Sequence, residues 1–164
     1  MNAAAWFEGF EQGRFTLNGT EIFARYGGQR DKPALLLLHG FPQTHAIWHR
    51  IAQHLRNDYF LVMPDLRGYG DSAKAPGLAD HSNYSKRAMG EDMVQLMAAL
   101  GAQRFNLCGH DRGGRVRCHF QSRQIGLGPL GIGTQRRVSQ DRVLVPAPRL
   151  LLAATEEDMV EEAP

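Results

Sequence analysis

The sequence predicts an α/β domain with a mostly parallel sheet. Two apolar stretches, Ala34–Leu38 and Tyr59–Met63, have the composition of strands buried on both faces of such a sheet. Stretches with helical periodicity separate these strands from each other and from a third, Arg104–Cys108. The alternation of strand and helix indicates βαβ units, and the length of 164 residues suits one domain.

The composition argues against several classes of protein. The chain has 19 Lys and Arg against 17 Asp and Glu, a formal charge of +2, so neither nucleic acid nor an acidic membrane is an expected partner. The longest aliphatic run, Ala34–Leu38, is far short of the ~20 residues that span a bilayer. Glu8 stands where an export signal would be apolar, and the two cysteines, Cys108 and Cys118, fit a reducing compartment. We therefore expect a cytoplasmic protein.

The first element along the chain is a β-hairpin. Phe15–Leu17 and Glu21–Tyr26 favour extended structure. Asn18 and Gly19 between them are the preferred pair for a two-residue turn with positive φ. The sequence therefore predicts an antiparallel pair before the first buried strand.

Two helices are predicted between the buried strands. The first runs over about residues 44–55, with Ile47, Ile51 and Leu55 on one face and Trp48 in the core. The second runs over about residues 85–100 and ends at Gly101. Its apolar side chains recur at helical spacing, as expected of a packing stripe: Met89, Met93, Leu96, Met97 and Leu100.

Each buried strand ends in a loop rich in polar residues and glycine. These loops are His39–Pro42, Pro64–Ser72 and Gly109–Arg115. Ligands of parallel α/β sheets bind at the carboxyl ends of the strands, so we expect the three loops to meet at one site.

The segment Gly109-His-Asp-Arg-Gly113 has the pattern of a nucleophile elbow. In such an elbow the turn from strand to helix is so sharp that the flanking positions must be small, and the central side chain points out over the helix N-terminus. The central residue is Asp111, which excludes a serine mechanism there. A carboxylate nucleophile attacks carbon, displaces a leaving group and leaves an ester.

Together the motifs resemble the α/β-hydrolase fold, and specifically the haloacetate (fluoroacetate) dehalogenases. The resemblance rests on His39-Gly-Phe-Pro-Gln43, Asp65-Leu-Arg-Gly-Tyr-Gly-Asp-Ser72, His81-Ser-Asn-Tyr-Ser-Lys-Arg-Ala-Met89 and Gly109-His-Asp-Arg-Gly-Gly-Arg-Val116. The first, second and core of the fourth are shared with epoxide hydrolases. The Tyr-Ser-Lys-Arg-Ala-Met stretch and the two arginines of the fourth motif point more narrowly to the dehalogenases.

The resemblance implies a role for each matching residue. Asp111 would attack the halogen-bearing carbon of a small 2-haloacid, with Arg112 and Arg115 holding the substrate carboxylate in planar, bidentate pairs. The backbone N–H groups of Phe41 and Arg112 would form the oxyanion hole when water attacks the ester. Neither a metal nor an organic cofactor is implied.

Structural alternatives exist for the same residues. Asp111 could cap the following helix, and Arg112 and Arg115 could be solvated surface residues. His39 is interpreted as a structural loop residue. His110 and Cys108 are interpreted as packing residues, and Asp65 and Arg67 as braces of their loop.

The resemblance stops at about Val116. Residues 117–164 contain six arginines but no lysine, tyrosine or tryptophan, and the four glycines and one proline of residues 126–133 do not suit a helix or a normal strand. We therefore divide the chain into residues 1–116, the N-terminal part of an α/β-hydrolase domain, and residues 117–164, a poorly ordered tail. The tail is either out-of-frame translation or a genuine divergent segment.

The tail also departs from the chemistry of the family. In this fold an acid and then a histidine follow the nucleophile. The one histidine after Asp111 is His119, and the first acid is Asp141, so the late histidine, the cap domain and the last strands are expected to be missing. Three functions stay open: a truncated haloacid dehalogenase that is expected to be inactive as given, an epoxide hydrolase-like enzyme, and a non-catalytic binding remnant. If the Asp111 ester forms, it should accumulate because the hydrolytic histidine is missing.

Overall fold

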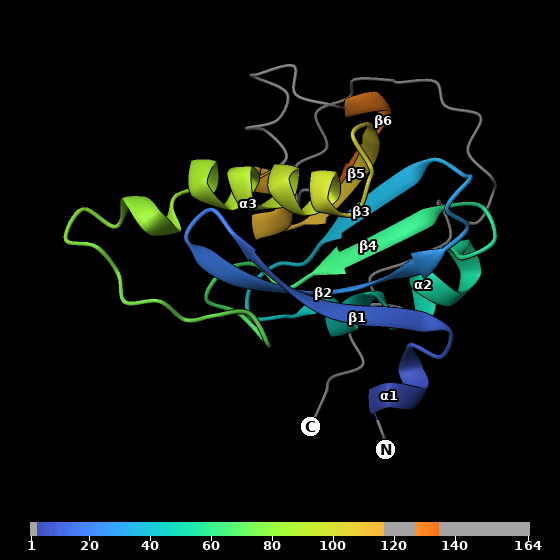
Figure 1. Cartoon of the computed structure of the whole chain (residues 1–164), viewed down its shortest axis with the longest axis horizontal. Coiled ribbons are helices and arrows are strands. Elements are labelled where there is room, and N and C mark those ends of the chain that lie inside the picture. Colours follow the sequence, from blue (N-terminus) through green and yellow to red (C-terminus); the bar gives the residue numbers. More distant parts are fainter. Residues whose placement is uncertain (1–2, 117–126, 135–164) are drawn as a thin grey trace.

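The computed structural model describes residues 3–116 and 127–134, and in them a six-stranded sheet has the order β1-β2-β4-β3-β5-β6 (Figure 1). The strands are β1 (Phe10–Leu17), β2 (Thr20–Gly28), β3 (Ala34–Leu38), β4 (Phe60–Pro64), β5 (Phe105–His110) and β6 (Leu127–Thr134). The helices are α1 (Ala3–Trp6), η1 (His45–Trp48), α2 (His49–Leu55), η2 (Ser82–Tyr84) and α3 (Lys86–Ala99). Strands β4, β3, β5 and β6 are parallel, which confirms the predicted fold class.

The predicted hairpin is confirmed in its strands and in its turn. β1 pairs antiparallel with β2, and Leu17 is the partner of Thr20 across the turn. Asn18 and Gly19 have φ values of 46° and 72°, the left-handed conformation that this pair adopts readily. β2 also pairs antiparallel with β4, so the hairpin extends the parallel part of the sheet on one side.

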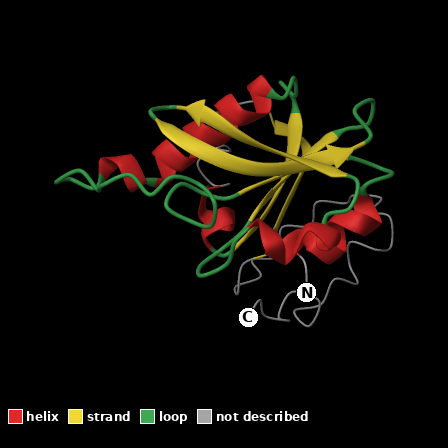
Figure 2. Ribbon diagram, turned by 60° about the horizontal axis from the view of Figure 1, so that its bottom comes forward, coloured by secondary structure: helices red, strands yellow, loops and turns green. Residues whose placement is uncertain are grey.

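Helices cover the two faces of the sheet, with α3 on one face and α2 on the other (Figure 2). Alternate side chains of β3 divide between two buried clusters: Leu36 and Leu38 pack in the cluster that includes α3, and Leu35 and Leu37 in the cluster that includes α2. This alternation follows from the period of two along a strand and explains why β3 is apolar throughout.

The two predicted helices form close to the expected boundaries. Thr44 caps the first at η1, and Ser85 caps α3 by accepting a hydrogen bond from the Ala88 N–H. The methionine stripe of α3 lies in the core as predicted, as does Trp48. Gly101, with φ of +81°, follows the helix where a stop was expected.

Strand β6 corrects the expectation that residues 126–133 form no normal strand. Residues 127–134 pair in parallel with β5, with a register shift between Phe105 and Leu107. Phe105 pairs with Leu127 and Leu107 with Gly131, so Pro129 falls at the irregularity, where a missing N–H does least damage to the ladder. The rest of the predicted tail, residues 117–126 and 135–164, lies outside the described residues. Within the described part, no helix is long and apolar enough to cross a membrane.

Candidate active site

Asp111 lies at a sharp turn between β5 and a helical segment, residues 112–116, as the elbow motif predicts. Its φ is 44°, a left-handed conformation that costs an L-residue free energy and is typical of strained functional turns. The Arg115 N–H donates to the Asp111 carbonyl at 3.2 Å and so begins the helix.

The flanking glycines are required by contact with backbone atoms. A Cβ on Gly109 would lie 2.5 Å from the Gly113 carbonyl carbon. A Cβ on Gly113 would lie 2.2 Å from the Leu38 carbonyl oxygen, in the neighbouring strand β3. The elbow therefore packs directly against the end of β3, which brings Asp111 beside the loop that follows that strand.

The loop after β3 supplies a backbone donor to Asp111. The Phe41 N–H donates to the Asp111 Oδ2 at 3.0 Å. The same loop approaches Asp111 closely at Gly40, where a Cβ would lie 2.7 Å from the Asp111 Cβ. One of the two carboxylate oxygens is thus held by a main-chain group.

The Asp111 carboxyl is held in its ionised form. The Phe41 N–H is the largest cause of a lowered pKa, and the Arg112 N–H, the Arg115 guanidinium and His110 act in the same direction. Partial burial opposes them, because desolvation penalises the charged form. A carboxylate that is ionised and half-exposed at the end of a strand has the charge and access that a nucleophile needs.

The two arginines of the motif lie beside Asp111, one helical turn apart. The Arg112 guanidinium sits over the Phe41 ring, 5.3 Å from its centroid, and the Arg115 side chain is exposed. Within the described residues, neither arginine forms an ion pair with an acid. The structure thus brings together all four residues that the sequence analysis named: Asp111, Phe41, Arg112 and Arg115.

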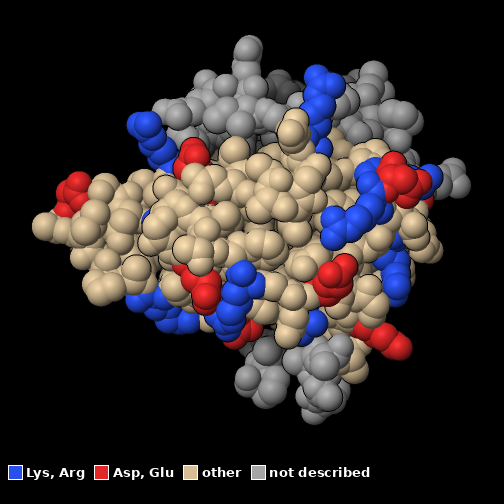
Figure 3. Space-filling model, in the orientation of Figure 1, with Lys and Arg blue, Asp and Glu red and all other residues tan. Residues whose placement is uncertain are grey.

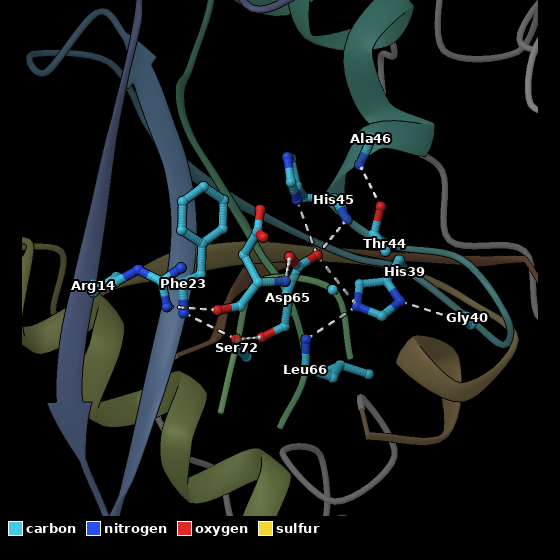
Figure 4. Close-up of polar contacts among 12 residues, drawn as sticks. Arg14, Phe23, His39, Gly40, Thr44, His45, Ala46, Asp65, Leu66 and Ser72 are labelled. Atoms are coloured by element: carbon cyan, nitrogen blue, oxygen red, sulfur yellow. Dashed lines mark hydrogen bonds and ion pairs between the residues drawn. The ribbon is translucent and has the colours of Figure 1, made fainter. Parts of the chain in front are cut away.

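His39 is a structural residue, as interpreted from the sequence. Its ring is fully buried, and Nε2 accepts a hydrogen bond from the Leu66 N–H at 3.0 Å (Figure 4). Nδ1 must then carry the proton, which it donates to the Gly40 carbonyl at 2.8 Å. Burial lowers the pKa of His39, so the ring is neutral and joins the loops after β3 and β4.

Asp65 braces the loop after β4, also as interpreted. Its Oδ1 accepts from the N–H and the Nδ1 of His45, at 2.7 and 3.0 Å, and its Oδ2 accepts from the Asp71 N–H (Figure 4). His45, Asp65 and Asp71 could offer three ligand atoms to a metal ion. These hydrogen bonds already account for both oxygens of the buried Asp65, so the group is explained as a loop brace.

The partner of Arg67 was not anticipated. Arg67 forms a buried ion pair with Asp92 on α3, and the Asp92 Oδ1 also accepts from the Asn18 amide at 2.9 Å. The available sequence signal was an aspartate next to the buried methionine stripe, a position where an isolated charge is costly. The hairpin turn, the β4 loop and α3 are joined by this one group.

Two buried polar atoms beside the elbow were also not anticipated. Gln43 Oε1 and His110 Nδ1 have no hydrogen-bond partner among the described residues. Both face Gly40, where they would lie 3.0 and 2.9 Å from an added Cβ. They leave one acceptor and one ring nitrogen beside Asp111 for a water or a ligand.

Comparisons with known proteins agree with this geometry. Residues 33–123 match the family model described as "alpha/beta hydrolase fold". The chain is 53% identical over 110 residues to a fluoroacetate dehalogenase from Burkholderia sp, covering 67% of this chain and 36% of that protein. It is 37% identical over 86 residues to a soluble epoxide hydrolase from Corynebacterium sp. (strain C12), covering 52% of this chain and 28% of that protein.

Solved structures give the same result. A Nostoc sp PCC 7120 structure assigned to the alpha/beta hydrolases has a TM-score of 0.65 and 46% identity, covering 68% of this chain and 38% of that one. A Pseudomonas aeruginosa structure assigned to the epoxide hydrolases has a TM-score of 0.67 and 39% identity, covering 73% and 39%. The chain thus spans between 28% and 39% of the length of these relatives.

Proposed function

Because the chain belongs to the α/β-hydrolase family, we propose that it carries the nucleophile and the carboxylate-binding residues of an enzyme that removes halide from small 2-haloacids. The observation that carries this proposal is an ionised carboxylate on a nucleophile elbow, beside two arginines that no described acid neutralises. The similarity to a fluoroacetate dehalogenase supports the same reaction.

The nucleophile is oriented by its main-chain donor. The Phe41 N–H holds Oδ2, which leaves the Asp111 Oδ1 to attack the halogen-bearing carbon. A bond forms between Oδ1 and that carbon while the carbon–halogen bond breaks, and the halide leaves with the electron pair. The product is an ester of Asp111, with Oδ2 as its carbonyl oxygen still at the Phe41 N–H.

The same donors serve the second half of the reaction. When water adds to the Asp111 Cγ, negative charge develops on Oδ2, which the Phe41 N–H already holds, and the Arg112 N–H also stabilises negative charge on this carboxyl group. Collapse of this intermediate breaks the bond from Cγ to Oδ1, returns the aspartate and releases a 2-hydroxyacid. One proton of the water passes to a base.

The arginines orient an anionic substrate. A guanidinium binds a carboxylate through two parallel N–H···O hydrogen bonds, so Arg112 and Arg115 can fix the carboxylate and direct the adjacent carbon at Asp111. The Phe41 ring supports Arg112 from below by a cation–π contact. Residues 112 and 115 are three positions apart in a helical segment, so the two arginine side chains extend from the same face.

Epoxide hydrolysis is the second candidate. The chain is also similar to epoxide hydrolases, at 37% identity to the Corynebacterium enzyme, and opening an epoxide uses an aspartate ester of the same kind. Epoxides carry no charge, however, and Arg112 and Arg115, which form no ion pair with an acid in the described part of the chain, would then have no partner in the substrate.

The test is to incubate the chain with chloroacetate and search for an ester by peptide mass analysis. We expect a carboxymethyl group on Asp111 that hydroxylamine removes, since hydroxylamine cleaves esters but not the thioethers formed at Cys108 or Cys118. Asp111→Asn is the control and should lose this adduct alone. Released glycolate would show that the ester is also hydrolysed.

Three results would refute the proposal. The absence of both a hydroxylamine-sensitive adduct and released glycolate in a folded sample would favour a non-catalytic remnant. An adduct that persists in Asp111→Asn would place the reaction elsewhere. An ester that forms with styrene oxide but not with chloroacetate would favour the epoxide reaction.

We also propose the division at residue 116, with residues 1–116 forming the N-terminal part of the hydrolase domain. Residues 127–134 add strand β6 to that part of the sheet. Limited proteolysis tests the division, because cleavage should concentrate after residue 116 and spare the earlier segments. Cleavage spread evenly over residues 3–116 would contradict it.

A further inference from the structure

Lys86 lies at the edge of the sheet that carries the active site. It is the first residue of α3, which connects the parallel strands β4 and β5 and so runs back along the sheet from their carboxyl ends. Figure 1 shows α3 beginning on the side of the molecule toward which the β4 arrow points. Asp111 follows the end of β5 at this same edge.

The Lys86 side chain runs along the core next to the elbow. It is half-buried, and its Nζ lies 3.8 Å from the Met89 Sδ, one helical turn further on. Met89 belongs to the same buried cluster as Val116, in the helical segment after Asp111. Arg112 stands one turn before Val116, so Lys86 and Arg112 are each one turn from members of the same cluster.

The electrostatic environment of Lys86 agrees with this placement. The pKa of Lys86 is lowered, first by burial and then by the positive charges of Arg112 and Arg115, whereas the Asp111 carboxylate acts in the opposite direction. Among the described residues, no acid forms an ion pair with any of the three cations. One carboxylate thus faces three positive side chains.

Helix stability does not explain a lysine at this position. The first turn of a helix favours acids, because the free N–H groups there carry partial positive charge. α3 has no acid in its first turn and begins with Lys86 and Arg87 instead. A cation placed against this preference, and next to two other cations, is more simply explained by an anion that all of them attract.

We propose that Lys86 is a specificity-determining residue that favours anionic over neutral substrates. The inference rests on the proposed function, in which a carboxylate nucleophile must approach a substrate that is itself a carboxylate. Arg112 and Arg115 hold that substrate, and the Lys86 charge offsets its repulsion from Asp111. The recognised ligand is a small monocarboxylate, and a neutral amide of the same shape gains nothing from Lys86.

The test measures the equilibrium binding of acetate and of acetamide to the full chain, with NMR titration as the readout. Lys86→Met removes the charge at similar volume, Lys86→Arg keeps it, and Arg87→Met removes the neighbouring exposed charge as a matched control. We expect Lys86→Met to weaken acetate binding about fivefold without changing acetamide binding. Lys86→Arg and Arg87→Met should bind acetate about as tightly as the unaltered chain.

Several outcomes would overturn the inference. The first is that Lys86→Met binds acetate as tightly as the unaltered chain, and the second is that it weakens acetate and acetamide binding equally. The third is that Arg87→Met weakens acetate binding as much as Lys86→Met does, and the fourth is that the unaltered chain binds no acetate. The chloroacetate reaction separates this result from the proposed function. If Lys86→Met forms the Asp111 ester at the unaltered rate, the role of Lys86 fails and the dehalogenase proposal stands. If acetate binding depends on Lys86 but no ester forms, the displacement chemistry fails and the charge selection stands.

Discussion

Replacing Gly113 with alanine tests whether the elbow depends on close backbone packing. The new Cβ would lie 2.2 Å from the Leu38 carbonyl oxygen and 2.6 Å from the Leu38 Cβ. Relief requires the helical segment to move away from β3 by about an ångström, since ordinary contacts begin near 3.4 Å. That movement would break the hydrogen bond from the Gly113 N–H to the His39 carbonyl, now 3.1 Å long.

The expected cost combines two effects. Overpacking a well-packed site costs about 1–3 kcal/mol, and a lost hydrogen bond adds about 1 kcal/mol, so we expect Gly113→Ala to lower the free energy of unfolding by about 3 kcal/mol. Gly101→Ala is the matched control. Gly101 has φ of +81° and no atom within 4 Å of an added Cβ, so backbone strain alone should cost about 1–2 kcal/mol.

Urea unfolding of the full chain, followed by circular dichroism, measures both variants. The reasoning predicts that Gly113→Ala has the lower midpoint and also loses the chloroacetate ester, because the shift separates Asp111 from the Phe41 N–H. If Gly113→Ala is no less stable than Gly101→Ala, the close approach to Leu38 does not constrain the elbow, and the argument fails.

Three further predictions concern the ion pair, the nucleophile and the tail. Asp92→Asn should lower the free energy of unfolding by about 3–5 kcal/mol, measured by urea unfolding, because it leaves the buried Arg67 charge unpaired; a loss below about 1 kcal/mol would contradict this. The lowered pKa of Asp111 means that ester formation should stay constant as pH falls through about 3.9, the ordinary aspartate pKa, and decline only at lower pH; a decline centred above pH 4 in the chloroacetate assay would be inconsistent with it. Resequencing the coding DNA from before codon 109 should reveal a one-base slip near codon 116, and an intact frame would favour a genuine divergent tail.

The fold and the elbow could be predicted because local rules decide them. The Asn18-Gly19 turn, the apolar run of β3 and the end of α3 before Gly101 each depend on neighbours in the sequence, and each forms as expected. The elbow is a special case, because its glycines are required by backbone contacts that any sequence with this turn must make.

Contacts between distant segments could not be predicted in this way. Asn18 and Asp92 are 74 positions apart, and their hydrogen bond depends on how the hairpin turn meets α3. The charges around Lys86 likewise come from two different helical segments. The prediction for residues 126–133 was wrong for a related reason: β5 offers an edge for pairing, which outweighs the local preferences of glycine and proline.

On the face that Figure 3 shows, the surface charge does not indicate a further binding site. On the face shown in Figure 3, acidic and basic side chains are interspersed over a largely uncharged surface. The nearly balanced composition therefore does not conceal a single-sign patch on this face. The local excess of positive charge at Asp111 consequently reflects the arrangement of a few side chains rather than the charge of the whole chain.

Phe41 contacts the nucleophile and a substrate-binding arginine through two different parts of the residue. Its backbone N–H fixes the nucleophile, while its ring, on a side chain that is 59% exposed, lies under the Arg112 guanidinium. Every residue except proline has that N–H, so the ring can change in evolution without loss of the donor. Substitutions at this position could then change the affinity for a substrate carboxylate gradually, while the reactive oxygen of Asp111 keeps its orientation.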